Sequence, residues 1–96
     1  MMVLITYDVD FTESKGAKRL RKVAKICEKY GVRVQNSVFE IIVDPAQLAQ
    51  IRLSLIQVID EDLDSIRIYH LGNNWNNKIE MIGTKRGFSQ DEPLLL

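Results

Sequence analysis

The sequence predicts an α+β domain whose elements follow the order strand, helix, strand, strand, helix, strand. Three observations carry this prediction: a short apolar, β-branched run near the start, two segments in which apolar residues recur at helical spacing, and β-rich runs between and after them. The chain of 96 residues is 46% hydrophobic and 27% charged, which is typical of a single globular domain, residues 1–96.

The first strand is predicted at residues 2–7, a short apolar run that is immediately followed by acids. A helix is predicted over residues 14–30, because its apolar positions recur at intervals of three and four and form one stripe. That stripe consists of Ala17, Leu20, Val23, Ala24, Cys27 and Tyr30. Gly31 follows as a helix C-cap.

Two β-rich runs, residues 32–34 and 37–43, come next and are separated by the polar pair Gln35-Asn36. This pair is either a tight turn or a bulge, and a hairpin is the favoured interpretation. A second helix begins at Asp44, a typical N-cap residue, with Pro45 in the first turn and Gln47 placed to complete a capping box. Its apolar stripe is Leu48, Ile51, Leu55, Val58 and Ile59. The helix is expected to stop at the acidic residues 60–62, which oppose the helix dipole.

A fourth strand is predicted at residues 65–71, followed by a break at 72–74. Residues 79–82 are expected to form an additional short strand or an extended edge, and residues 83–96 an extended C-terminal tail that ends in three leucines. This order is the ferredoxin-like βαββαβ arrangement, which has both helices on one face of an antiparallel sheet. The other face needs a cover, so we expect a homodimer.

Two cellular settings are disfavoured by the sequence. No apolar run approaches the roughly 18 residues of a membrane span, and the N-terminus lacks the basic region and cleavage site of a signal peptide. Cys27 is the single cysteine, which precludes an internal disulfide and makes the reducing cytoplasm the expected location. Its place in an apolar stripe predicts a core residue.

The formal net charge of zero conceals an uneven distribution. Residues 15–29 contain seven bases and one acid, so one helix face is expected to attract polyanions. A solvated helix face usually intersperses acids with its bases, and here they are almost absent. We therefore expect Lys18, Arg19 and Lys22 to contact nucleic-acid phosphates in a sequence-independent, salt-sensitive manner.

Asp8 and Asp10 follow the first strand, two positions apart. If the strand continued, both carboxylates would point to one side; alternatively, Asp8 ends the strand and Asp10 makes a turn. A hard-metal site is the sharper hypothesis, because Mg²⁺ takes one or two carboxylates and keeps several waters. A two-fold axis near this strand end would bring two copies of Asp8 together. His70 is expected at the surface, and Trp75 is expected to pack in its asparagine-rich loop, with base stacking as the alternative.

Four stretches in combination are similar to a known family: MMVLITYDV, KRLRKVAKICEKYG, RVQNSVFEI and DSIRIYHLGNNW. They resemble the small adaptation protein family of CRISPR antiviral defence systems, and the resemblance covers nearly the whole chain. The family consists of metal-dependent endonucleases that also act as integrase adaptors. The resemblance implies that Asp8 is the catalytic, metal-binding aspartate, with Mg²⁺ or another divalent cation as cofactor. It also places Arg19, Arg33 and Phe39 where the family has residues that affect nuclease activity or the interface, and on this basis Arg33 is expected to bind nucleic acid together with Lys18, Arg19 and Lys22.

Two functions follow from the resemblance and stay open at this point. One is hydrolysis of RNA or double-stranded DNA by a metal held at Asp8, at a slow rate because no general base is evident. The alternative is a non-catalytic dimeric adaptor that binds nucleic acid and bridges subunits of the larger CRISPR integrase during spacer acquisition. The adaptor needs the basic helix and a partner-binding edge, whereas the nuclease needs Asp8. Ile79 to Ile82 and Leu94 to Leu96 are the candidate dimer or integrase contacts.

Overall fold

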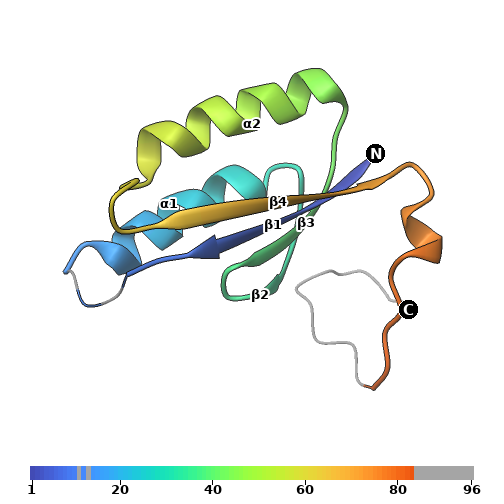
Figure 1. Cartoon of the computed structure of the whole chain (residues 1–96), viewed down its shortest axis with the longest axis horizontal. Coiled ribbons are helices and arrows are strands. Elements are labelled where there is room, and N and C mark those ends of the chain that lie inside the picture. The colour runs from blue at the N-terminus through green and yellow to red at the C-terminus, as the bar shows by residue number, and fades with distance from the viewer. Residues whose placement is uncertain (11, 13, 84–96) are drawn as a thin grey trace.

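Figure 1 shows a computed structural model of the chain, in which residues 1–10, 12 and 14–83 are described. The predicted order of elements is confirmed: β1 (Met2–Asp8), α1 (Gly16–Cys27), β2 (Gly31–Gln35), β3 (Val38–Ile42), α2 (Pro45–Val58) and β4 (Ser65–Gly72), followed by a short 3₁₀ helix, η1 (Trp75–Asn77). The strands form an antiparallel sheet in the order β2-β3-β1-β4. Both helices cover one face of this sheet, as the ferredoxin-like arrangement requires, and the described chain leaves the other face open (Figure 1).

Alternation along β1 separates the two faces of the sheet. Val3, Ile5 and Tyr7 are buried toward the helices, whereas the residues between them point to the open face. The core is completed by Phe39, Ile41 and Val43 from β3 and its end, by Val23, Ala24 and Cys27 of α1, and by Leu48, Ile51 and Leu55 of α2. Most of the predicted helix stripes are therefore confirmed as core. Ala17 is the exception, because it is exposed in the first turn of α1, beyond the edge of the core.

The N-terminus of α2 forms as its sequence predicts. The Asp44 carboxylate accepts a hydrogen bond from the Gln47 N–H at 2.7 Å, and the Gln47 side chain accepts one from the Asp44 N–H at 2.9 Å. This reciprocal pair is the capping box, with Pro45 directly behind it. The helix ends at Val58, just before the acidic residues 60–62.

The first helix is shorter than predicted, because the chain after Cys27 tightens into a turn: the Tyr30 N–H donates to the Cys27 carbonyl, three residues back. The hairpin between β2 and β3 contains both features that the sequence left open. The turn lies at residues 36–37, and the register of β2 shifts between Arg33 and Gln35, as it does at a bulge.

The prediction of an additional strand at residues 79–82 is wrong for the single chain. A strand needs a neighbour for its N–H and C=O groups, and η1 turns the described chain away from the edge of β4, as Figure 1 shows. Residues 79–82 are exposed instead, with Ile82 at 91% of its full accessibility. The predicted tail, residues 83–96, lies outside the described residues except for Gly83.

Candidate functional site

Asp8 is the last residue of β1 and lies on the open face of the sheet, exposed to solvent. It pairs in register with Ser65, the first residue of β4, and the next pair on this face is Thr6 with Arg67. These four residues line a pocket of about 220 Å³. The sequence places them together because residues two apart in a strand share a face.

The pocket offers oxygen donors for a hard cation. Its lining supplies one carboxylate and two hydroxyls, and Mg²⁺ commonly binds proteins through one or two carboxylates while it keeps several waters. Among the described residues, no three or more His, Cys, Asp or Glu side chains gather closely enough to hold a metal ion. The donor set of one chain therefore fits only part of the coordination shell of Mg²⁺, and water, substrate or a second copy must complete it.

Arg67 brings a positive charge to the same pocket. The pKa of Arg67 is raised, chiefly by a hydrogen bond with the Tyr69 side chain and also by the negative charge of Asp8. The guanidinium therefore lies close enough to Asp8 to offset part of its charge. The resemblance did not point to this residue, although the register of β1 and β4 places it beside the metal candidate.

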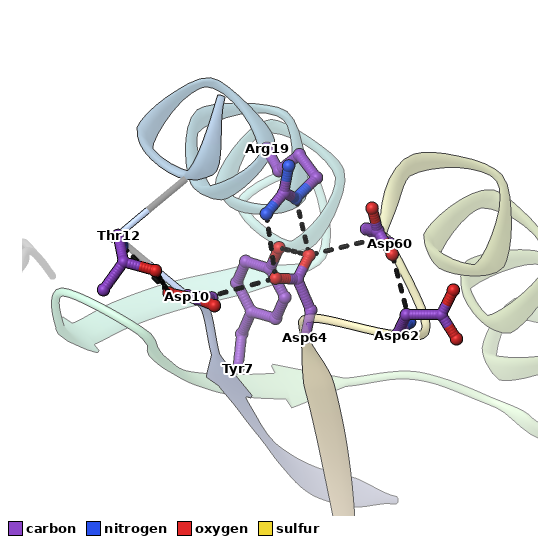
Figure 2. A network of polar contacts seen from close by, with 7 residues as sticks. All are labelled: Tyr7, Asp10, Thr12, Arg19, Asp60, Asp62 and Asp64. Atoms are coloured by element: carbon purple, nitrogen blue, oxygen red, sulfur yellow. Dashed lines mark hydrogen bonds and ion pairs between the residues drawn. The ribbon is translucent and has the colours of Figure 1, made fainter. Parts of the chain in front are cut away.

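Asp10 is not part of this pocket. Because β1 ends at Asp8, the alternation that would place both carboxylates on one side stops before Asp10. The Asp10 carboxylate instead accepts hydrogen bonds from the N–H and the hydroxyl of Thr12, which lower the pKa of Asp10 (Figure 2). The structure thus agrees with the turn interpretation.

Asp64 is the centre of a buried polar network that sequence reasoning missed (Figure 2). Its carboxylate accepts hydrogen bonds from Arg19 Nε at 2.7 Å and Arg19 Nη2 at 3.1 Å, and from the Tyr7 hydroxyl. It also accepts the backbone N–H of Asp60 at 3.1 Å and of Asp10 at 3.4 Å. One carboxylate therefore joins the end of β1, the loop after it, α1 and the loop that leads into β4.

The network keeps Asp64 ionised. Burial alone would raise the pKa of Asp64, but the hydrogen bonds from Arg19, Tyr7 and the backbone outweigh it and lower the pKa to about 2. The pKa of the Tyr7 hydroxyl is raised, first by burial and then by the adjacent carboxylate. At neutral pH the network contains a carboxylate, a guanidinium and a neutral phenol, which is the combination in which every hydrogen bond is satisfied.

Arg19 has a different place from the one predicted for it. Its guanidinium forms a two-pronged ion pair with Asp64, and its side chain is only 12% exposed. A bidentate, largely buried pair commits the guanidinium to the fold, so the structure does not support the prediction that Arg19 contacts phosphates, which stays untested. The signal available in the sequence was an acid directly before the fourth strand, but nothing local links it to an arginine 45 positions earlier.

A basic groove lies between α1 and β2. Its lining residues are Lys18, Arg21, Lys22, Ala24, Lys25, Glu28 and Arg33, around a volume of about 430 Å³. Five of these seven are cations, so the groove has a strongly positive potential. The structure therefore brings the predicted Lys18, Lys22 and Arg33 together, and adds Arg21 and Lys25, which the sequence did not single out.

Arg33 reaches this groove from the helix side of β2. Its Nε lies 3.4 Å from a carboxylate oxygen of Glu28, and its guanidinium carbon lies 5.6 Å from the centre of the Phe39 ring. Phe39 itself is fully buried and pairs with Ile5 across the sheet. In the single chain Phe39 is therefore a core residue that supports Arg33 and the sheet, and its effect on the interface or on nuclease activity stays a prediction.

The other residues considered in the sequence, His70, Trp75 and Cys27, line neither the Asp8 pocket nor the basic groove. His70 is exposed opposite Val3, and Trp75 is partly buried in η1. Cys27 is fully buried, as predicted, and burial raises the pKa of its thiol to about 12. A thiol in this setting is not a nucleophile at neutral pH.

Within the described chain, neither helix is long and apolar enough to cross a membrane.

A family model described as "CRISPR associated protein Cas2" matches residues 1–79. The chain belongs to the Cas2 family. A relative from Halalkalibacterium halodurans, named CRISPR-associated endonuclease Cas2, is 57% identical over 95 residues, which cover 99% of both chains. A Cas2 from Nitratidesulfovibrio vulgaris, named CRISPR-associated endoribonuclease Cas2, is 49% identical over 96 residues, which cover all of this chain and 94% of the relative.

The fold agrees with that of solved Cas2 proteins. The crystal structure of Streptococcus pyogenes Cas2 at pH 6.5 matches with a TM-score of 0.78 and 57% sequence identity, over 86% of this chain and all of the other. The resemblance seen in the sequence and the predicted α+β fold are both confirmed.

Proposed function

We propose that this Cas2-family protein is a metal-dependent endonuclease of CRISPR adaptation in which Asp8 is the catalytic, metal-binding residue. The observation that carries the proposal is the exposed Asp8 carboxylate in a pocket that also contains two hydroxyls and a guanidinium. The names of the relatives support hydrolysis of RNA or DNA as the reaction class.

Asp8 would hold Mg²⁺ or another divalent cation, which supplies Lewis-acid polarisation of the phosphoryl group and an acidified water. The chain itself supplies orientation: the hydroxyls of Thr6 and Ser65 flank the carboxylate and can hydrogen-bond water or a phosphate oxygen. No histidine or second carboxylate lines this pocket within the described chain. Positioned proton transfer contributes about 10²- to 10⁴-fold, so we expect slow turnover.

A homodimer through the open sheet face would complete the site. That face carries Leu4, Val38, Ile42 and Tyr69, of which Ile42 is 55% and Tyr69 43% exposed. A second copy related by a two-fold axis would cover these side chains and bring a second Asp8 toward the first. Two carboxylates would then be available to one or two cations.

Nucleic acid would bind the basic groove between α1 and β2 through its phosphates. The groove contains Lys18, Arg21, Lys22, Lys25 and Arg33, and such contacts release counterions regardless of sequence. Arg19 is left out of this set because it is paired with Asp64. RNA and double-stranded DNA are both retained as substrates, and we propose the cytoplasm as the setting in which a buried, reduced Cys27 is stable.

The alternative function is a structural adaptor that presents nucleic acid to the larger CRISPR integrase. It is favoured by exposed apolar side chains that the described chain leaves uncovered after β4, namely Ile79, Met81 and Ile82. A cluster of this kind is typical of a surface that binds another protein. The adaptor role does not need Asp8, so the two functions can be separated by mutation.

The test of catalysis is Asp8→Asn, which keeps the shape of the side chain and removes its charge. Cleavage of labelled single-stranded RNA and duplex DNA in Mg²⁺ is expected to fall by at least about 10²-fold, with Glu61→Gln as the control at another exposed acid. Cleavage by Asp8→Asn at the parent rate would overturn the nuclease proposal. Loss of cleavage with intact spacer acquisition would assign the cellular role to the adaptor.

The test of the groove is the double charge reversal Lys18→Glu and Lys22→Glu. Affinity for duplex DNA is expected to fall, and the slope of log affinity against log salt is expected to become shallower by about 2, because two phosphate contacts are lost. Arg52→Glu on exposed α2 is the matched control. An unchanged slope in the double variant would rule out the groove as the phosphate-binding surface.

A further inference from the structure

Arg67 is the second charged residue that lines the Asp8 pocket. It lies on the open face of β4, opposite Thr6 and diagonal to Asp8, and it lines the same pocket of about 220 Å³. It is exposed and shares a hydrogen bond with the Tyr69 side chain, whereas Arg19 and Arg33 form ion pairs with Asp64 and Glu28. Its planar, always charged guanidinium presents several donors toward whatever enters the pocket.

A guanidinium beside a single carboxylate is unfavourable for a metal site taken alone. The charges of Asp8 and Arg67 nearly cancel, so a divalent cation entering the pocket meets little net attraction from this chain. The lining of the pocket adds no second carboxylate that would offset the charge of Arg67, and the described chain gathers no group of three or more His, Cys, Asp or Glu side chains that could hold a metal ion. Arg67 would therefore oppose metal binding unless an additional anion enters with the cation.

A phosphodiester is an anion that can bind the cation and the Arg67 guanidinium at the same time, and so offset the charge of Arg67. One non-bridging oxygen can ligate a cation held by Asp8 while another accepts hydrogen bonds from the Arg67 guanidinium, whose fork matches phosphate geometry. Thr6 and Ser65 lie between them as neutral hydroxyls, which can bond either the phosphate or its water. The net charge then alternates in sign along the pocket. It is positive for Asp8 with its divalent cation, negative for the phosphodiester and positive for the Arg67 guanidinium.

The geometry points to Arg67 as the phosphate-binding residue of the Asp8 pocket, where it makes binding of the divalent cation depend on the presence of a nucleic-acid phosphate. This inference rests on the proposed function, since it assigns a role toward the same cation. It distinguishes the pocket from the groove of α1 and β2, which would hold phosphates distant from the reacting bond. The substrate phosphate next to Asp8 would be the one that is hydrolysed.

The coupling can be measured by titrating Mn²⁺ and following its free electron paramagnetic resonance signal. The parent protein is expected to bind Mn²⁺ about tenfold more tightly when a short 2′-O-methyl oligoribonucleotide is present. In Arg67→Gln the protein alone is expected to bind Mn²⁺ at least as tightly as the parent, and the oligonucleotide is expected to improve affinity by less than about twofold. Arg67→Lys should retain an intermediate coupling, because it keeps the charge and loses the fork.

The controls separate this inference from the function on which it rests. Asp8→Asn measures the background of Mn²⁺ that binds directly to the oligonucleotide. Arg52→Gln removes an exposed arginine on α2 and is the control for the loss of a positive charge outside the pocket. Full coupling in Arg67→Gln, or weaker Mn²⁺ binding by that variant without oligonucleotide, would overturn the role of Arg67 and leave Asp8 as the metal ligand. Undiminished Mn²⁺ binding by Asp8→Asn would instead overturn the metal site.

A second readout requires no metal. In EDTA, oligonucleotide affinity measured against salt concentration is expected to show a slope shallower by about 0.7 in Arg67→Gln than in the parent, which is the value of one lost single-strand phosphate contact. An identical slope in both proteins would exclude a phosphate contact by Arg67. Unchanged thermal unfolding and hydrodynamic size of the variants would show that the comparison is made between folded proteins of the same oligomeric state.

Discussion

Two aspartates at the same end of the sheet have opposite environments. Asp8 is exposed, and within the described chain no hydrogen bond to its carboxylate is formed. Asp64, which precedes the strand partner of Asp8, is buried and accepts five hydrogen bonds (Figure 2). Residue type alone therefore does not assign a role. The Asp64 carboxylate, whose lone pairs already accept hydrogen bonds, stabilises the fold, whereas the Asp8 carboxylate has unused lone pairs and can bind a cation.

Removal of Asp64 is expected to have the largest effect on stability. Asp64→Ala breaks the buried ion pair with the Arg19 guanidinium and removes the acceptor of the Tyr7 hydroxyl, and breaking a buried pair typically lowers the free energy of unfolding by about 3–5 kcal/mol. Asp8→Asn removes a solvent-exposed carboxylate and is expected to change the free energy of unfolding by less than about 0.5 kcal/mol. Urea unfolding monitored by circular dichroism measures both values. Equal destabilisation by the two substitutions would contradict the distinction between the two sites.

Acid is expected to lower the free energy of unfolding by a smaller amount. The pKa of Asp64 is depressed to about 2 in the folded protein and returns to about 3.9 on unfolding. Its contribution, about 2–3 kcal/mol, is therefore present above about pH 4 and is lost as the pH falls from about 4 through about 2. Thermal unfolding midpoints of the parent and of Asp64→Asn, compared across this window, isolate the effect from that of other acids. Parallel pH profiles for the two proteins would show that Asp64 has no depressed pKa.

Local patterns predicted most of the fold. The apolar periodicity of both helices, the capping box at Asp44 and the β-rich runs each depend on residues within a few positions, and the structure confirms them. The strand predicted at residues 79–82 does not form, because a strand depends on pairing with a neighbour and not only on its own residues. The described chain provides no neighbouring strand there.

The candidate site was only partly predictable, because its partnerships are long-range. The exposed Asp8 at the end of β1 followed from the strand pattern, and its role follows from the family resemblance. Arg19 carries the same charge as Lys18, so no local signal distinguishes a buried ion pair from a surface cation; the partner of Arg19 lies 45 residues away. Arg67 became visible only with the register between β1 and β4.

The close approach of Gly16 to the loop after β1 has a mechanical consequence. A side chain at this first position of α1 would overlap the backbone carbonyl of Asp10, so the helix start and that loop are in direct contact. The ion pair between Arg19 and Asp64 adds a second attachment of α1, to the loop that leads into β4. These two attachments hold the basic residues of α1 at a fixed position relative to the adjoining ends of β1 and β4, where Asp8 and Ser65 lie.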